Sequence, residues 1–178
     1  MHDKRLVIVI GHYGSGKTEF AVNYAIKMKE IYDSVSIADL DIVNPYFRSR
    51  EKRELFEEIG IKLFDSSIRN TAVDIPALPA ELMGVILNQN VKSILDVGGD
   101  PVGARVLARY SDQIKNVEYD MLYVINGNRP STSTVEGVLK YLKMIEDTSR
   151  LKITGLVNNT HMLKSTTVED VEFGHELT

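Results

Sequence analysis

Short apolar runs alternate with longer amphipathic stretches along this chain. Five runs rich in β-branched residues have the length of strands buried in a parallel sheet: Leu6–Ile10, Val35–Ala38, Ile94–Val97, Leu122–Ile125 and Ile153–Val157. A short extra strand is expected at Lys62–Phe64. Because helical patterns separate these runs, the order indicates βαβ crossovers. The pattern therefore predicts an α/β fold: a doubly wound, mostly parallel sheet with helices on both faces, in three α/β/α layers.

The helices are predicted by apolar residues that recur at helical spacing between the strands. The expected helices are Glu19–Ile31, Ala80–Leu87, Gly103–Ile114 and Val135–Ile145, with a last one from Thr166. Ser133-x-x-Glu136 and Thr166-x-x-Glu169 both fit a capping box, which marks a helix start. We expect one domain over residues 1–178. Little sequence follows the last strand, so either the fold is minimal or the domain continues beyond Thr178.

The bulk composition excludes several classes of protein. The chain has 178 residues, 43% of them hydrophobic and 26% charged, with a net charge of −4. That charge argues against a dedicated nucleic-acid binder. The absence of cysteine excludes disulfides and thiolate-held zinc or iron–sulfur clusters. No apolar run approaches the ~20 residues that span a bilayer. We therefore expect a cytoplasmic protein that binds neither nucleic acid nor membrane.

The strongest chemical signal is the segment GHYGSGKT at residues 11–18, which fits G-x-x-x-x-G-K-[ST]. Its glycines let the backbone wrap closely around a phosphate, its lysine supplies a charge to the β- and γ-phosphates, and its threonine offers a hydroxyl to Mg²⁺. An apolar strand precedes the segment and a helical pattern follows, which is the context that this loop requires. The expected nucleotide-binding residues are Gly11, Gly14, Ser15, Gly16, Lys17 and Thr18.

Two acidic segments follow predicted strands and are expected at the same edge of the sheet. Asp96 begins D-V-G-G-D, where it can hold Mg²⁺ through water while Gly98 or Gly99 offers an amide to the γ-phosphate. Asp39 and Asp41 end the second strand, and one of them is a candidate to orient the attacking water. An exposed turn and a solubilising loop are the alternatives. The predicted catalytic residues are Lys17, Asp41 and Asp39, and the predicted metal ligands are Thr18, Asp96 and Asp41.

Taken together, GHYGSGKT, DLDIVNPYFR, LDVGGD and GLVNNT resemble the MinD/ParA/CobQ-type P-loop ATPases over nearly the whole chain. The resemblance implies an ATP-driven switch that uses ATP and Mg²⁺, often as a nucleotide-sandwiched homodimer. It implies that Lys17 and Thr18 bind triphosphate and Mg²⁺. It further implies that Asp41 orients water, that Asp96 lies on the Mg²⁺ side, and that Asn158 contacts the edge of the base.

The chain departs from that family at His12. Members with the deviant loop carry a lysine there, which acts on the partner's nucleotide across the dimer. A neutral imidazole does not supply the same permanent charge, since its ordinary pKa is ~6.5. The resemblance therefore does not decide whether the chain forms a homodimer. A loop residue that packs beside Tyr13 is the simpler interpretation of His12.

Three functions are compatible with these residues. The first is an ATP-hydrolysing switch that acts on a protein partner of unknown identity. The second is a small-molecule phosphotransferase, in which Arg129 and the basic cluster Arg48–Arg53 clamp an acceptor anion. The third is a non-hydrolysing nucleotide-binding module, which the missing lysine at His12 favours. ATP is preferred over GTP because residues 158–161 lack the Lys and Asp of the guanine-reading N-K-x-D pattern.

Overall fold

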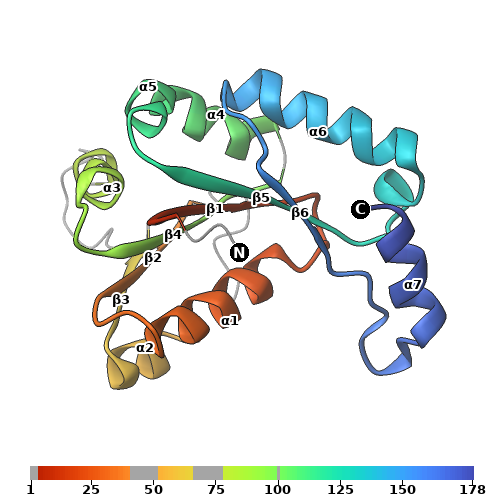
Figure 1. Cartoon of the computed structure of the whole chain (residues 1–178), viewed down its shortest axis with the longest axis horizontal. Coiled ribbons are helices and arrows are strands. Elements are labelled where there is room, and N and C mark those ends of the chain that lie inside the picture. The colour runs from red at the N-terminus through yellow and green to blue at the C-terminus, as the bar shows by residue number, and fades with distance from the viewer. Residues whose placement is uncertain (1–3, 41–51, 66–77, 100) are drawn as a thin grey trace, which may run out of the picture.

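The computed structural model describes residues 4–40, 52–65, 78–99 and 101–178. Six strands form one parallel sheet in the order β3-β2-β4-β1-β5-β6 (Figure 1). The strands are β1 (Leu6–Ile10), β2 (Val35–Asp39), β3 (Ile61–Asp65), β4 (Lys92–Asp96), β5 (Tyr119–Ile125) and β6 (Gly155–Asn158). The expected doubly wound parallel sheet is therefore confirmed.

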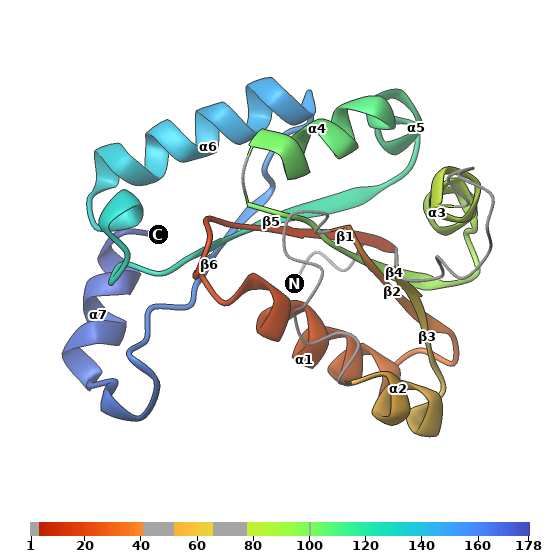
Figure 2. The ribbon, with the colours of Figure 1, turned by 180° about the vertical axis from the view of Figure 1, so that it is seen from behind.

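Helices cover both faces of this sheet (Figures 1 and 2). One face carries α1 (Lys17–Lys29) and α2 (Arg53–Ile59). The other carries α3 (Leu78–Leu87), α4 (Pro101–Arg109), α5 (Ser111–Lys115) and α6 (Val135–Ser149). The last helix, α7 (Val168–Glu176), lies beside the edge strand β6. Within the described residues, no helix has the length and apolar content needed to span a membrane.

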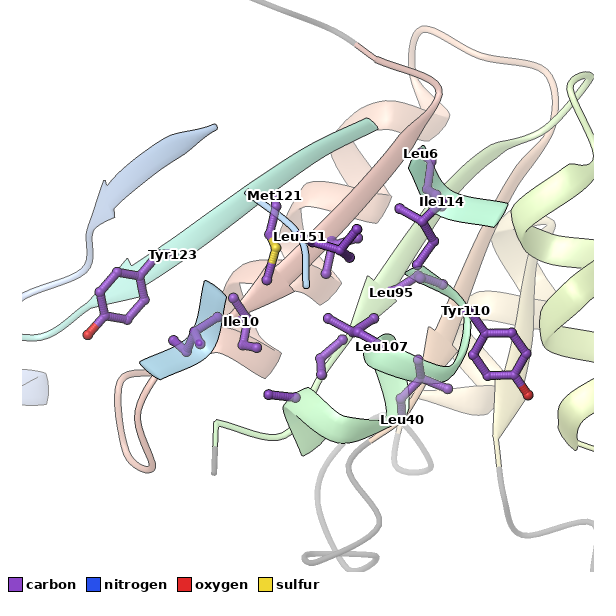
Figure 3. Close-up of a cluster of buried hydrophobic side chains, with 14 of the residues drawn as sticks. Leu6, Ile10, Leu40, Leu95, Leu107, Tyr110, Ile114, Met121, Tyr123 and Leu151 are labelled. Carbon is purple, nitrogen blue, oxygen red and sulfur yellow. The ribbon is translucent and has the colours of Figure 1, made fainter. Parts of the chain in front are cut away.

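The core is divided into two layers by the central strand β1, whose five residues are all buried. Leu6, Ile8 and Ile10 pack on the side of α4 and α6, and Figure 3 shows part of this cluster. Val7 and Val9 pack on the side of α1. A strand covered on both faces needs apolar residues at every position, which explains why the sequence shows a continuous apolar run here.

Two sequence predictions about the helices are wrong in detail. The helix expected at Gly103–Ile114 is divided at Tyr110, where α4 ends and α5 begins. The helix caps lie one residue later than expected. Thr134, in place of Ser133, accepts a 3.1 Å hydrogen bond from the Gly137 amide, and Thr167, in place of Thr166, forms a capping box with Asp170. Each site offers two adjacent hydroxyl residues, and the one with extended backbone directly before the helix becomes the cap.

Candidate functional site

Residues 11–18, called the phosphate loop below, lead from β1 into α1 at the carboxyl edge of the sheet. Gly14 and Gly16 have φ angles of 74° and 81°, in the left-handed region that glycine adopts without strain. The Ser15 amide donates to the His12 carbonyl at 3.0 Å and closes a tight turn. The Phe20 amide donates to the Gly16 carbonyl at 3.0 Å and starts the helix. The glycine positions of the motif therefore lie where the backbone reversal needs them.

Two glycines permit a close approach between backbone segments. A Cβ atom added at Gly99 would overlap the carbonyl group of Gly11, so the turn after β4 lies directly against the loop. A Cβ atom at Gly11 would overlap the carbonyl oxygen of Val124 in β5. The loop is thus held between its two neighbouring strands. The predicted amide donor Gly99 lies beside the loop as expected.

Three polar side chains of the loop are buried. Ser15, Lys17 and Thr18 are 1%, 7% and 8% exposed. Within the described residues the Ser15 hydroxyl has no hydrogen-bond partner, which is unusual for a buried hydroxyl. The residue before α1 is Gly16, which has no side chain, so the first backbone amides of α1 receive no hydrogen bond from a capping side chain. A buried ammonium, an unpaired hydroxyl and an uncapped helix start together form a donor set that fits an anion.

Two of the predicted acidic residues reach the same edge of the sheet. Asp39 and Asp96 end β2 and β4 and are register partners, and Asp96 also pairs in register with Val9 of β1. Asp96 is 1% exposed. Asp41, predicted as catalytic residue and metal ligand, lies outside the described residues. Carboxylate and hydroxyl oxygens are the donors that Mg²⁺ prefers, so the pair Asp96 and Thr18 fits that ion. Within the described part of the chain, no three acidic or histidine side chains form a metal cluster.

Two side chains that follow later strands of the sheet bind the backbone of the loop. Asn159, which follows β6, donates from Nδ2 to the Ser15 carbonyl at 2.7 Å. Arg129, which follows β5, donates from Nε to the Gly14 carbonyl at 2.9 Å. The peptide bonds of the described residues are trans, so each C=O and the next N–H point in opposite directions. Asn159 therefore fixes the Gly16 amide to point away from it.

Both polar atoms of the Asn158 side chain, the residue predicted to contact the base, form hydrogen bonds within the protein. Its Nδ2 donates to the Val171 carbonyl in α7 at 2.9 Å. Its Oδ1 accepts from the Thr160 amide at 3.0 Å. These bonds attach α7 to the end of β6. Contact with a base stays a prediction.

Asn126, which the sequence did not single out, organises the loops around the site. It directly follows β5 and is 0% exposed. Its Oδ1 accepts from the amides of Asn128 at 3.0 Å and His161 at 3.4 Å, and its Nδ2 donates to the His161 carbonyl at 3.3 Å. Its own carbonyl accepts from the Arg129 amide at 3.1 Å. The sequence signal that could have identified Asn126 is its place as a polar residue directly after the apolar run Leu122–Ile125.

His12 contacts the helix layer as well as its own loop. Its Nδ1 lies 2.8 Å from the Tyr13 carbonyl oxygen. Its ring meets the Tyr141 ring of α6 edge-on, with 4.8 Å between centroids. Tyr13 itself is 73% exposed. The expected contact with Tyr13 is therefore made through the Tyr13 backbone, and the His12 ring also packs against Tyr141.

A cavity of about 560 Å³ lies elsewhere, between α3 and the sheet. Its lining includes Ser36, Lys62 and Ser93, near the amino-terminal ends of β2, β3 and β4, and no residue of the phosphate loop. In doubly wound sheets, ligands bind at the carboxyl ends of the strands. The donor chemistry of the loop, rather than the volume of this cavity, therefore identifies the candidate site.

Comparison with known proteins supports the fold assignment. Neither a protein-family model nor a curated protein matches the chain. The signal recognition particle receptor FtsY from Elizabethkingia anophelis is similar in structure, with a TM-score of 0.55 and 19% identity over 98% of this chain. FtsY from Mycoplasma mycoides matches with a TM-score of 0.55 and 19% identity over 97%. This chain spans 55% and 56% of those two chains.

The fold and the loop define a class of protein. The chain has the P-loop NTPase fold, in the form found in the receptor FtsY. A ParA family ATPase from Chlorobium tepidum TLS matches over 99% of this chain and 91% of its own, with 15% identity and a TM-score of 0.42. That likeness is too low to carry an argument, so membership of the MinD/ParA group stays a prediction.

Proposed function

We propose that this chain binds ATP with Mg²⁺ at residues 11–18 and hydrolyses the ATP as a molecular switch for a protein partner. The observation that carries the proposal is the loop itself. Two left-handed glycines shape it, and Lys17, Thr18 and an unpartnered Ser15 hydroxyl are buried within it. Backbone amides at a helix start, an ammonium and hydroxyls are the donors that bind a polyphosphate.

The remaining residues then take distinct roles. Lys17 binds the β- and γ-phosphates, and Asn159 keeps the Gly16 amide in a fixed orientation. Thr18 and Asp96 would hold Mg²⁺, which neutralises the charge that develops on the phosphate oxygens. Asp39, at the carboxyl edge beside Asp96, or Asp41 orients the attacking water.

Phosphate release from ATP tests this proposal. We expect slow, Mg²⁺-dependent hydrolysis by the parent protein. Lys17→Ala should weaken ATP binding at least about tenfold, which corresponds to about 1.4 kcal/mol, and should abolish measurable turnover. Lys143→Ala, which changes an exposed lysine in α6, is the matched control and should behave as the parent. A Lys17→Ala protein that hydrolyses ATP at the parental rate would contradict the proposal.

The same assay separates the alternative functions. Phosphate that appears on an added acceptor instead of in solution would indicate a phosphotransferase. ATP binding without free phosphate in a single-turnover experiment would indicate a binding module. A pull-down with Asp41→Ala in the presence of ATP would then search for the partner of a hydrolysis-blocked state.

A further inference from the structure

We infer that Arg129 is a phosphate-binding residue of the same site and supplies a second cationic side chain to the polyphosphate. This inference rests on the proposed nucleotide binding. Arg129 follows β5 and lies 115 residues from Gly14 in the sequence, yet its Nε donates to the Gly14 carbonyl at 2.9 Å. The fold therefore delivers a guanidinium to the phosphate loop from a distant segment.

The guanidinium occupies the space next to Gly14 that a side chain would need. A Cβ atom at Gly14 would lie 3.0 Å from Nε, 3.2 Å from Cζ and 3.5 Å from Nη2 of Arg129. Gly14 also has a φ of 74°. Glycine at this position thus meets two requirements, the left-handed backbone and room for the guanidinium.

Arg129 is held in place at two points and still has donors to offer. Its backbone amide donates to the Asn126 carbonyl at 3.1 Å, and its Nε donates to the loop. Within the described residues, neither Nη atom has a hydrogen-bond partner. An arginine fork matches the geometry of phosphate oxygens. Because the side chain is already restrained, little entropy remains to be lost when the Nη atoms bind an anion.

Few cationic side chains are available within the loop itself. Lys17 is the only lysine or arginine within residues 11–18, and position 12 holds a histidine. Asp39 and Asp96 place carboxylates at the same edge of the sheet. Arg129 is thus positioned to supply, from within the same chain, positive charge beside a loop that contains one lysine.

Isothermal titration with inorganic tripolyphosphate and with Mg-ATP tests the inference. Arg129→Gln removes the charge and should weaken both ligands about tenfold. Arg129→Lys keeps the positive charge and should lose less affinity for both ligands than Arg129→Gln. Arg109→Ala, in the last turn of α4, is the control and should bind as the parent. Arg129→Gln should also reduce the dependence of affinity on salt, which a merely structural role would leave unchanged.

The outcomes separate the two proposals. If the parent protein binds neither ligand, the proposed function fails. If the parent binds both and Arg129→Gln binds within twofold of it, only the inference about Arg129 is overturned. Should Arg129→Gln not fold, the parent protein gives the answer by NMR. Tripolyphosphate should shift the Nε–H signal of Arg129, assigned with Arg129→Lys, and an unshifted signal overturns the inference.

Discussion

Asn126 positions both loops that flank the phosphate loop through hydrogen bonds within the protein. Its side chain pairs with the backbone of Asn128 and His161, and its carbonyl accepts from the Arg129 amide. A fully buried amide with this many partners is costly to remove, because each backbone group left unpaired loses its bond without regaining water. The residue thus links the sheet to the side chains that touch the site.

We predict that Asn126→Ala lowers the free energy of unfolding by about 1–3 kcal/mol. Urea denaturation measures this change. The variant should also bind Mg-ATP more weakly, because the loops that carry Arg129 and Asn159 lose the side-chain bonds to Asn128 and His161. Asn116→Ala, at an exposed position after α5, is the control and should change stability by less than about 0.5 kcal/mol. Equal stabilities of the two variants would show that Asn126 does not organise these loops.

At the scale of elements, replacing each of two helix glycines with alanine should change stability in opposite directions. Gly84 lies within α3, and a Cβ atom added there meets no atom within 4 Å. Gly174 lies within α7, and a Cβ atom there would overlap Thr160 Oγ1 and Asn158 Oδ1. The same substitution therefore tests helix propensity at one position and docking at the other.

We expect Gly84→Ala to stabilise the protein by about 0.5–1 kcal/mol, because alanine restricts the unfolded chain and favours the helix. Gly174→Ala should lower stability despite the same intrinsic gain, because α7 must move away from the end of β6. Thermal unfolding of both variants and the parent shows whether each substitution raises or lowers the melting temperature. A stabilising Gly174→Ala would mean that α7 does not pack on Thr160 as described.

The start of α7 carries a pH dependence. The pKa of Asp170 lies below its ordinary value of 3.8, first because the Thr167 backbone amide donates to the carboxylate and next because the Asn128 side chain does. A depressed pKa means that the ionised carboxylate stabilises the folded state. That contribution is present above pH 3.8 and is lost as the pH falls through the lower folded value.

Acidification below pH 3.8 should therefore loosen the capping box and the contact between α7 and the loop after β5. NMR chemical shifts of the α7 amides, followed from about pH 5 to pH 2.5, measure this change. In Asp170→Asn the titration of these shifts should be strongly reduced. If the titration were unchanged in Asp170→Asn, the pH dependence of the α7 amides would come from another group.

The sequence predicts the elements well where one physical signal dominates. Leu6–Ile10 is identical in prediction and structure, because a strand buried on both faces is a continuous apolar run bounded by polar residues and glycine. The division between α4 and α5 at Tyr110 was not predicted, since both helices continue one apolar pattern. The capping residues were displaced by one position because adjacent threonine and serine side chains offer equivalent hydroxyls.

The local part of the candidate site and the placement of Asp39 and Asp96 at its edge of the sheet were predictable from the sequence. Residues 11–18 form a contiguous motif whose glycine spacing reflects its backbone geometry. The pairs Arg129–Gly14 and Asn159–Ser15 join residues separated by 115 and 144 positions. Such pairs depend on strand order, because the sheet places β5 next to β1 and β6 next to β5. Periodicity along the chain does not determine that order, so these contacts needed the structure.

At the scale of the whole molecule, the parallel sheet collects the ends of β1, β2, β4, β5 and β6 at one edge. The loop, the acidic pair Asp39 and Asp96, Arg129 and Asn159 all lie there. A ligand bound at this edge contacts segments from both halves of the chain. Its binding free energy should therefore stabilise the domain as a unit.

We predict that Mg-ATP at about 100 times its dissociation constant stabilises the protein by about 2.7 kcal/mol. For a domain of this size, that corresponds to a rise in melting temperature of about 5–10 °C. Adenosine, which lacks phosphates, should give almost no rise, because the donors of the loop recognise the anion. Differential scanning calorimetry measures the shifts.

The base should matter less than the phosphates, but it should still discriminate. Residues 158–161 lack the lysine and aspartate that read guanine, so Mg-GTP should raise the melting temperature less than Mg-ATP at equal concentration. Lys17→Ala should reduce both shifts to about half or less, because every nucleotide shares the polyphosphate. A rise with adenosine equal to that with ATP would contradict the prediction, since the binding energy would then come from a surface other than the glycine loop.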